Sequence, residues 1–261
     1  MKSKLLTFIA CLILSSGLSL AETAEFAPPG YVSGCKMIYV TSNSITITSG
    51  KLSDSTDSQY MVLSTNVLVD ITKSGDNGLD TGTETSNLWY VVFVAVATNQ
   101  SIVGVLSTNM SGPTGYTDFR VIGCVRNDSN KDIRPFIQRW NGSTRLFEWD
   151  AAIADTRPLQ NGNSTTNFVL DLSDYVPPTA TSAKLQVSFE SGASGSASDS
   201  LRLKADGINN STLRLSAGVV STDKIITNGD MSTSVDQKIT YKVDSTNNRA
   251  TIVVKGYYDE L

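Results

Sequence analysis

The sequence predicts an all-β fold made of antiparallel β-sandwich modules, an N-terminal β-module followed by a jelly-roll-like sandwich. Apolar and polar residues alternate with a period of two along most of the chain, and no stretch beyond the N-terminus keeps a helical period. Gly, Asn, Asp and Ser separate the alternating runs, as turns require. The chain has 261 residues, which is enough for one large all-β domain or two smaller ones.

The N-terminus is predicted to be a secretory signal peptide, residues 1–21. Lys2 and Lys4 precede an apolar stretch from Leu5 to Leu14, and the small-x-small site Ser19-Leu20-Ala21 follows, so we expect cleavage after Ala21. Cys11 as a lipoprotein cysteine is the alternative, but "FIAC" lacks the usual Leu three positions earlier. The mature chain is therefore expected to be secreted or attached to the cell surface, with the periplasm as a further location.

Composition argues against two kinds of partner. The apolar run of the signal peptide is too short to cross a bilayer of about 30 Å, and no later stretch approaches the roughly 20 residues that a transmembrane span needs. The net charge is -4 and Lys and Arg are scattered, whereas nucleic-acid binding needs clustered cations. We therefore expect no transmembrane span and no nucleic-acid partner.

A central strand is expected from Leu88 to Val96, which is apolar on both faces. Its length suits a strand, and Trp, Tyr, Phe and Val are the residue types that favour strands. The alternative is a strand of an outer-membrane barrel. A barrel, however, needs many strands with an apolar outward face and aromatic girdles, which runs such as Ser200–Asp206 do not provide.

The C-terminal strands alternate strictly. Leu185, Val187 and Phe189 point to one face while the polar residues between them point to the other, as in a strand with one face in water. Such strands are expected to bury their apolar faces against a second sheet. Across the chain, the clearest alternating runs are residues 44–50, 117–126, 183–191, 200–206, 211–218, 238–245 and 250–258.

A boundary is expected between Asp150 and Asn167, where periodicity fades and Pro158 and Gly162 occur. This divides the mature chain into an N-terminal β-module, residues 22–155, and a C-terminal β-sandwich, residues 156–261. The Gly- and Ser-rich stretch at 191–200 lies close between two strands, so we interpret it as a long hairpin loop.

The chain contains no histidine, which removes Ser-His-Asp and Cys-His nucleophile activation and His-based zinc sites. Paired-carboxylate chemistry, as in glycoside hydrolysis, stays open. The run "FEWD" puts Glu148 and Asp150 on one face of a strand and Trp149 on the other, with Trp140 one hairpin away. Either these four residues contact a sugar, or the acids mark the polar face of a hairpin whose aromatic residues lie in the core.

Calcium is the one metal that the acidic turns suggest, because it prefers oxygen ligands. Asp76 and Asp80 lie in "GDNGLD", and Asp128 and Asp132 lie in "NDSNKD". Neither stretch matches an EF-hand loop, and turns rich in Asp and Asn also form for conformational reasons alone. No other cofactor is expected.

Two cysteines remain after the predicted cleavage, Cys35 and Cys124. An exported chain can keep such a pair oxidised. The sequence is compatible with one disulfide between them and equally with two buried thiols.

The order of several short motifs resembles a module of tailed-phage tail and tail-fibre proteins and of prophage-derived structural proteins. In that module an acidic "RDST"-like strand start is followed by "GLDTG...WY", "LLSTS", "PSGYT" and "RIG.VRTD". The matching positions here, in the same order, are Asp54-Ser55-Thr56, Leu79 to Gly82, Trp89-Tyr90, Leu106-Ser107-Thr108, Gly115-Tyr116-Thr117 and Ile122-Gly123. The match covers about half of the mature chain, and the segment from Val169 to Phe189 is similar to the linker and sandwich start that often follow.

The resemblance implies a non-enzymatic surface-binding or structural protein whose exposed loops engage a cell-surface glycan or a protein partner, and it implies homo-oligomers, trimers especially. The signal peptide departs from phage tail proteins, which are assembled in the cytoplasm, and suggests a bacterial protein that uses the module outside the cell. Two alternatives stay open. One is a carbohydrate-active enzyme that uses Glu148 and Asp150, and the other is a self-assembling surface adhesin or filament subunit.

Overall fold

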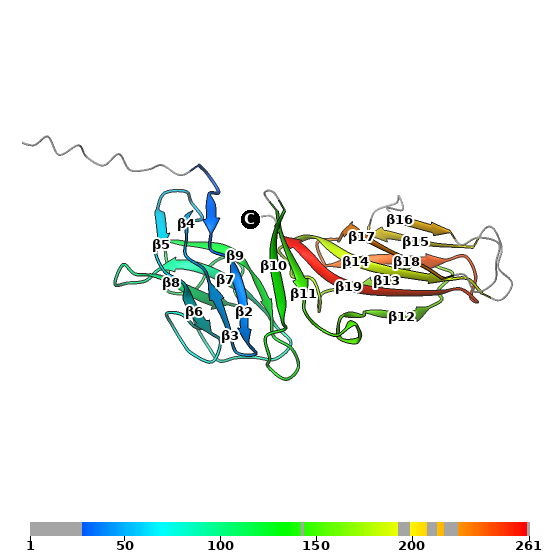
Figure 1. The fold of residues 1–261 in the computed structure, drawn as a ribbon, viewed down its shortest axis with the longest axis horizontal. Helices are drawn as coiled ribbons and strands as arrows, with labels where there is room; N and C mark the ends of the chain where they lie inside the picture. The colour runs from blue at the N-terminus through cyan, green and yellow to red at the C-terminus, as the bar shows by residue number, and fades with distance from the viewer. Residues whose placement is uncertain (1–27, 142–143, 193–198, 208–212, 217–223, 260–261) are drawn as a thin grey trace, which may run out of the picture.

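The structure is a computed structural model that describes residues 28–141, 144–192, 199–207, 213–216 and 224–259. Two β-rich modules lie end to end along the long axis of the molecule (Figure 1). The predicted signal peptide, Cys11 included, lies outside the described residues. Within the described ranges the one helical element is a short 3-10 helix, η1 (Ile153–Thr156), and no helix there is long and apolar enough to cross a membrane. The predicted all-β fold is confirmed.

The N-terminal module packs short antiparallel sheets around a common core. One sheet has the order β1-β4-β5, a second has β8-β7-β9, and β11-β10-β2-β3-β6 belong to a larger sheet. The strands are β1 (Val32–Gly34), β2 (Met37–Thr41), β3 (Ser44–Ile47), β4 (Gly50–Ser53), β5 (Tyr60–Leu63), β6 (Val67–Asp70), β7 (Trp89–Val96), β8 (Ile102–Ser107), β9 (Phe119–Arg126), β10 (Phe136–Asn141) and β11 (Thr144–Trp149).

Strand β7 is the central strand that the sequence predicted. It pairs with β8 on one side and β9 on the other, and all its residues except the two at its ends are buried. Its register with β9 shifts between Val92 and Phe93, opposite Gly123. Gly123 has a φ of +148°, and a Cβ at this position would lie 2.6 Å from the ring of Phe147. Only glycine therefore fits this close approach between β9 and β11.

The C-terminal module is a jelly roll. One sheet has the order β12-β19-β14-β17 and the other β13-β18-β15-β16, and the chain crosses between the two sheets in the double Greek-key order of that fold. Strand β14 buries Leu185, Val187 and Phe189 as predicted. The strands are β12 (Leu159–Gly162), β13 (Phe168–Asp171), β14 (Ala180–Glu190), β15 (Ser200–Ala205), β16 (Leu213–Ser216), β17 (Lys224–Ser232), β18 (Lys238–Val243) and β19 (Arg249–Asp259).

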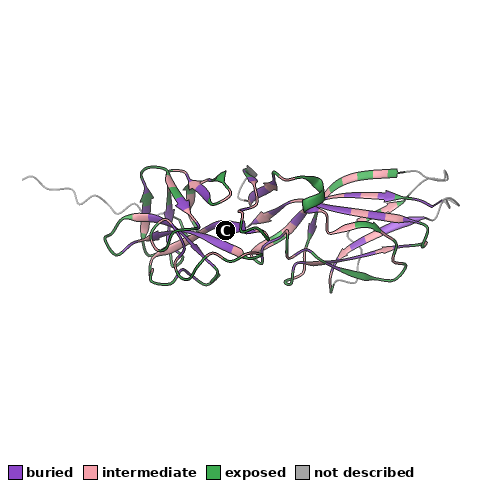
Figure 2. Ribbon diagram, turned by 90° about the horizontal axis from the view of Figure 1, so that it is seen from below, coloured by how far each residue is buried: buried purple, intermediate pink, exposed green. Residues whose placement is uncertain are grey.

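The two modules share a sheet. Strand β19 pairs with β14 along one edge over its whole length, and its other edge pairs from Gly256 to Asp259 with β11 of the N-terminal module. The result is a nine-stranded sheet that runs from β17 at one end of the molecule to β6 at the other. Buried residues line the strands on both sides of this junction, and exposed residues concentrate in the loops (Figure 2). The predicted division at residue 155 stays a prediction, because the hydrogen-bonded sheet continues across it.

Candidate functional site

Glu148, one of the predicted carboxylate pair, is held in an ion-pair network on the outer face of the nine-stranded sheet. Its Oε1 accepts a hydrogen bond from Lys184 Nζ at 2.7 Å, and its Oε2 accepts one from Arg139 Nε. The bonds from Lys184 and then Arg139 lower the pKa of Glu148. The carboxylate is therefore charged at neutral pH and unsuited to protonate a leaving group. Asp150 is exposed just beyond β11.

Trp149 is a core residue. Its side chain is only 7% exposed, its ring centroid lies 5.9 Å from that of Trp89 and 5.7 Å from that of Tyr257, and its indole N–H donates to the carbonyl of Tyr175 at 3.1 Å. The prediction that Trp149 contacts a ligand at the surface is corrected accordingly, because its polar and apolar atoms are both occupied inside the protein. The side chain of Trp140 lies outside the described residues.

In the first acidic turn, the side chains of Asp76 and Asp80 form hydrogen bonds with neighbouring segments. Asp80 Oδ2 accepts hydrogen bonds from Ser107 Oγ at 2.8 Å and from the backbone N–H of Thr114 at 2.7 Å. Asp76 Oδ1 accepts one from the hydroxyl of Tyr116 at 2.7 Å. These bonds give both carboxylates a structural role that needs no metal.

In the second acidic turn, at Asp128, the aspartate side chain accepts hydrogen bonds from the backbone of its own turn. Asp128 Oδ1 accepts the backbone N–H groups of Asn130 at 2.7 Å and Asp132 at 3.0 Å, which is the geometry of an Asx turn. Across the part of the chain that the structure describes, no group of three or more His, Cys, Asp or Glu side chains is placed to hold a metal ion. Calcium binding by Asp76, Asp80, Asp128 or Asp132 stays a prediction without structural support.

The structure shows two buried thiols, which is the second of the two alternatives that the sequence left open for the cysteines. Cys35 and Cys124 are both free and buried, and they belong to two different hydrophobic clusters. Burial raises the pKa of the Cys35 thiol to about 11 and raises that of Cys124 further. The predicted disulfide is not formed, and both thiols act as small apolar core groups.

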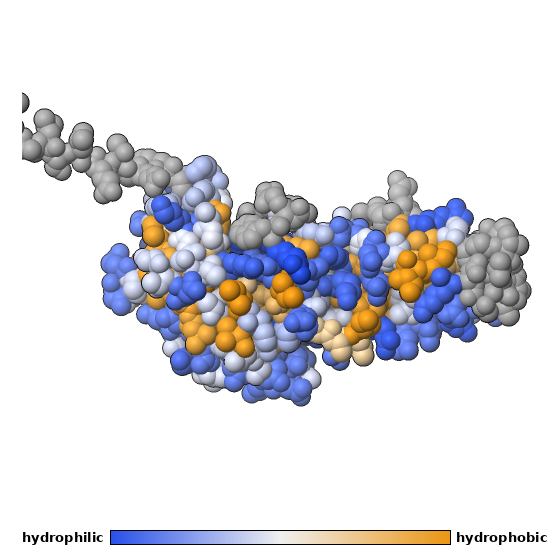
Figure 3. Space-filling model, in the orientation of Figure 1, coloured by the Kyte–Doolittle hydropathy of each residue, from blue (hydrophilic) through white to orange (hydrophobic). Residues whose placement is uncertain are grey.

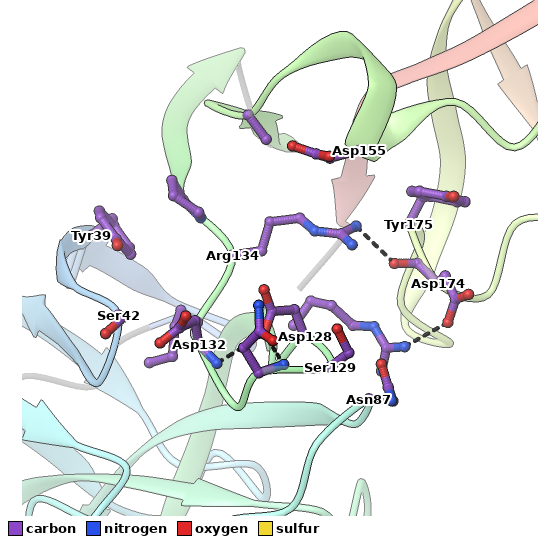
Figure 4. Close-up of a pocket in the computed structure, with 15 residues that line it drawn as sticks. Tyr39, Ser42, Asn87, Asp128, Ser129, Asp132, Arg134, Asp155, Asp174 and Tyr175 are labelled. Carbon is purple, nitrogen blue, oxygen red and sulfur yellow. Dashed lines mark hydrogen bonds and ion pairs between the residues drawn. The ribbon is translucent and has the colours of Figure 1, made fainter.

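A cavity of about 520 Å³ opens where the two modules meet. It is lined by the end of β2, by the turn and strand start between β9 and β10, by η1, and by the turn that leads from β13 into β14. Figure 4 shows its side chains, including Tyr39, Asp132, Arg134, Asp155 and Tyr175. None of the sequence-predicted sugar contacts lines this cavity, whereas Asp128 and Asp132 of the second acidic turn do.

Arg126 forms the base of this junction cavity. It ends β9, its side chain is nine-tenths buried, and its Nη2 donates to Asp174 Oδ1 at 2.5 Å. Its guanidinium carbon lies 5.8 Å from the ring centroid of Trp89. Among the described residues its Nε has no hydrogen-bond partner, and such a buried donor is costly unless something occupies it.

Arg134 crosses the cavity toward Asp174 and Tyr175, below Asp155 (Figure 4). Its Nη1 donates to the carbonyl of Asp174 at 3.0 Å. Its guanidinium carbon lies 5.3 Å from the ring centroid of Trp149 and 5.4 Å from that of Tyr175. Burial, and then the positive charge of Arg126, lower the pKa of Arg134. Two arginines from the N-terminal module therefore fix the turn at Asp174 of the jelly roll.

The rest of the lining offers unused hydrogen-bonding groups. The carboxylates of Asp132 and Asp155 accept no hydrogen bond from the described residues. Burial, and then the negative charge of Asp132, raise the pKa of the Tyr39 hydroxyl. The cavity thus combines free acceptors, guanidinium donors and two tyrosine rings.

Sequence reasoning missed Arg126, Arg134, Asp174 and Tyr175. The available signal was an arginine on each side of the acidic turn in "VRNDSNKDIR". A charged residue at the end of a buried strand is unusual without a partner, but the partner, Asp174, lies 48 positions away along the chain.

Comparison with known proteins adds little. No family model matches the chain, and no curated protein sequence does. Among solved structures, an isomalto-dextranase from Arthrobacter globiformis in complex with panose aligns with 86% of this chain and 36% of its own, at 8% identity and a TM-score of 0.21. The chain therefore spans about a third of that enzyme, and a TM-score of this size is too low to establish a common fold.

Proposed function

We propose that the chain is an exported, non-enzymatic binding protein that holds a cell-surface glycan in the junction cavity. The observation that carries the proposal is the cavity itself, a volume of about 520 Å³ lined by free carboxylates, guanidinium groups and tyrosine rings. This volume lies within the range of small-molecule sites. The ion pair of Arg126 with Asp174 supports it by fixing the base of the cavity.

Sugar chemistry suits this lining. Sugar hydroxyls both donate and accept, so they complement Asp132 and Asp155 as acceptors and Arg134 as a donor. Tyrosine rings offer an apolar face with a polar edge, which matches the mixed character of a pyranose. The lining carries four aspartates against two arginines, so the unit inside the cavity is expected to be uncharged.

A binding role is favoured over hydrolysis because Glu148 is charged and occupied. Both of its oxygens are bonded to cations, Lys184 and Arg139, and neither Glu148 nor Asp150 lines the cavity. A glycosidase needs one carboxyl that stays protonated near a second one. Export, which rests on the predicted signal peptide, and the phage-tail-like character of the N-terminal module belong to the same proposal.

Binding to a glycan array, run with calcium and again with a chelator, tests the proposal on the purified mature chain. The double variant Asp132→Asn/Asp155→Asn removes two negative charges and replaces one acceptor oxygen of each carboxylate by an NH2 donor, and we expect it to lose at least about tenfold in affinity. Asp236→Asn, which changes an exposed aspartate in the turn between β17 and β18, is the matched control and should bind normally. Equal binding by the double variant, or no bound glycan at all, would overturn the proposal.

Self-association is a second candidate function, favoured by an apolar patch on the outer face of the N-terminal module. Ile38 pairs with Ile137 on β10, and these two residues together with Val40 and Leu68 each leave more than two fifths of their surface exposed. Figure 3 shows hydrophobic side chains gathered over β2, β3 and β6. Sedimentation velocity of the wild type and of Ile38→Thr/Leu68→Thr tests this role, and a wild type that stays monomeric at high concentration contradicts it.

A further inference from the structure

A second hollow, of about 140 Å³, lies on the outer face of the jelly roll. Strands β14 and β19 form its floor, with Gln186 and Ser188 on the first and Thr251 on the second. Arg157, just after η1, forms one wall, and Lys224 at the start of β17 forms the other. Ser188 is the register partner of Thr251 on one side and of Ile226 on the other, so the floor is a continuous piece of sheet.

The floor residues face solvent because their neighbours face the core. Leu185, Val187 and Phe189 are buried, and alternation directs Gln186 and Ser188 to the opposite face. Each of these polar side chains carries a hydrogen-bond donor, an amide N–H in one case and a hydroxyl in the other. The hollow therefore presents donors from below and cations from two sides.

Among the described residues, no acid forms an ion pair with the positive charge in this hollow. The described residues that line it include Arg157 and Lys224 and no carboxylate. In the described ranges neither cation is within ion-pair distance of an acid. Glu190 is the register partner of Lys224 without pairing to it, and Asp155, two positions before Arg157, lines the junction cavity instead. The described part of this chain, whose net charge is -4, thus contains two cations over a donor-rich floor that pair with no described acid.

We infer that this basic hollow binds an oxyanion group, the carboxylate or sulfate of an acidic glycan. A guanidinium and an ammonium on opposite walls, with hydroxyl and amide donors beneath, match the several acceptor oxygens of such a group. The small volume suits one charged substituent. Ile153 and Ile226, both half exposed at the rim, offer apolar surface for the ring that carries it.

The place of η1 connects the hollow to the junction cavity. Ala151 and Asp155 of this segment line the cavity, whereas Ile153 and Arg157 line the hollow. A glycan with an uncharged unit in the cavity would have to cross η1 to place an acidic unit in the hollow. This extension to acidic glycans rests on the proposed function, while oxyanion binding by Arg157 and Lys224 does not.

The first experiment tests oxyanion binding separately from its extension to acidic glycans. Backbone amide shifts of Ser188 and Thr251 are followed by NMR in the full mature chain while sulfate replaces chloride at constant ionic strength. Sulfate should shift both signals in the wild type and not in Arg157→Gln/Lys224→Gln. The matched control Lys204→Gln/Arg214→Gln changes one lysine and one arginine on the opposite sheet of the sandwich and should behave as wild type. No sulfate effect, or an equal effect in the Arg157→Gln/Lys224→Gln variant, would overturn the oxyanion site.

A tetrasaccharide of neutral units that carries one terminal galacturonate, and the same molecule with that unit as its neutral methyl ester, then test the link to glycans. We expect the acid to bind at least about tenfold more tightly than the ester, and Arg157→Gln/Lys224→Gln to remove this difference while leaving ester binding unchanged. Equal binding of the two forms by the wild type would overturn the preference for acidic glycans. If sulfate shifts the signals but neither form of the glycan binds, the oxyanion site is supported and its extension to this glycan is contradicted. The Asp132→Asn/Asp155→Asn variant on the glycan array tests the proposed cavity site independently.

Discussion

Asp259 should make the stability of the protein depend strongly on pH. It lies at the end of β19, fully buried, as the register partner of Arg145 on β11. Its Oδ2 accepts a hydrogen bond from Thr179 at 3.4 Å, and its Oδ1 has no hydrogen-bond partner among the described residues. Burial raises the pKa of Asp259 from 3.8 to about 7, although the positive charge of Arg145 acts in the other direction.

The sign of the effect follows from the proton count. Between pH 4 and 7 the folded chain keeps a proton on Asp259 that the unfolded chain has released, so stability falls as the pH rises through this window. A difference of about three pKa units corresponds to about 4 kcal/mol. Asp259→Asn mimics the protonated acid at every pH, so we expect it to stabilise the fold by less than about 1 kcal/mol at pH 4 and by about 4 kcal/mol at pH 8.

Urea denaturation of the wild type and of Asp259→Asn, at several pH values from 4 to 8, measures this difference. Asp236→Asn, an exposed aspartate, controls for the loss of one negative charge. A gap between wild type and Asp259→Asn that does not widen with pH would refute the reasoning, because burial of a charged carboxylate at Asp259 would then carry no cost.

Three further predictions concern single sites. Glu148→Gln breaks the ion pairs with Arg139 and Lys184 on a partly exposed surface, so thermal unfolding should show a loss of no more than about 1 kcal/mol, and any glycan binding should persist. Gly123→Ala places a Cβ 2.6 Å from the ring of Phe147 at a φ of +148°, so urea denaturation should show a loss of at least about 2 kcal/mol, and an unchanged midpoint would contradict the close approach. Cys35 and Cys124 should resist a thiol-modifying reagent in the native mature chain and react fully in denaturant, as mass spectrometry can show.

The strand pattern was predictable because it is local. Alternation at Leu185, Val187 and Phe189 and the doubly apolar run from Leu88 to Val96 both reflect which faces meet a core, and the structure confirms each. Trp149 shows what a local sequence pattern cannot predict. Alternation correctly separates it from Glu148, but the face it occupies is covered by Trp89 and Tyr257, and no local pattern reveals which residues cover a face.

The junction cavity was not predictable for a related reason. Tyr39, Arg126, Asp155 and Tyr175 come from four separate segments that meet only in the folded junction of the two modules. The acidic turn at Asp128 marked the right region, but its spacing suggested a cation ligand, whereas the structure shows a self-capped turn at the edge of an arginine-based cavity.

The sheet that β19 carries from one module into the other also bears on the thermodynamics of recognition. A junction crossed by backbone hydrogen bonds from Gly256 to Asp259 is expected to resist hinge motion, so we expect the walls of the cavity to keep their spacing when the proposed ligand binds. Little conformational entropy is then lost on binding, and affinity can come from a few modest contacts. The same rigidity confines selectivity to ligands whose shape already matches the site.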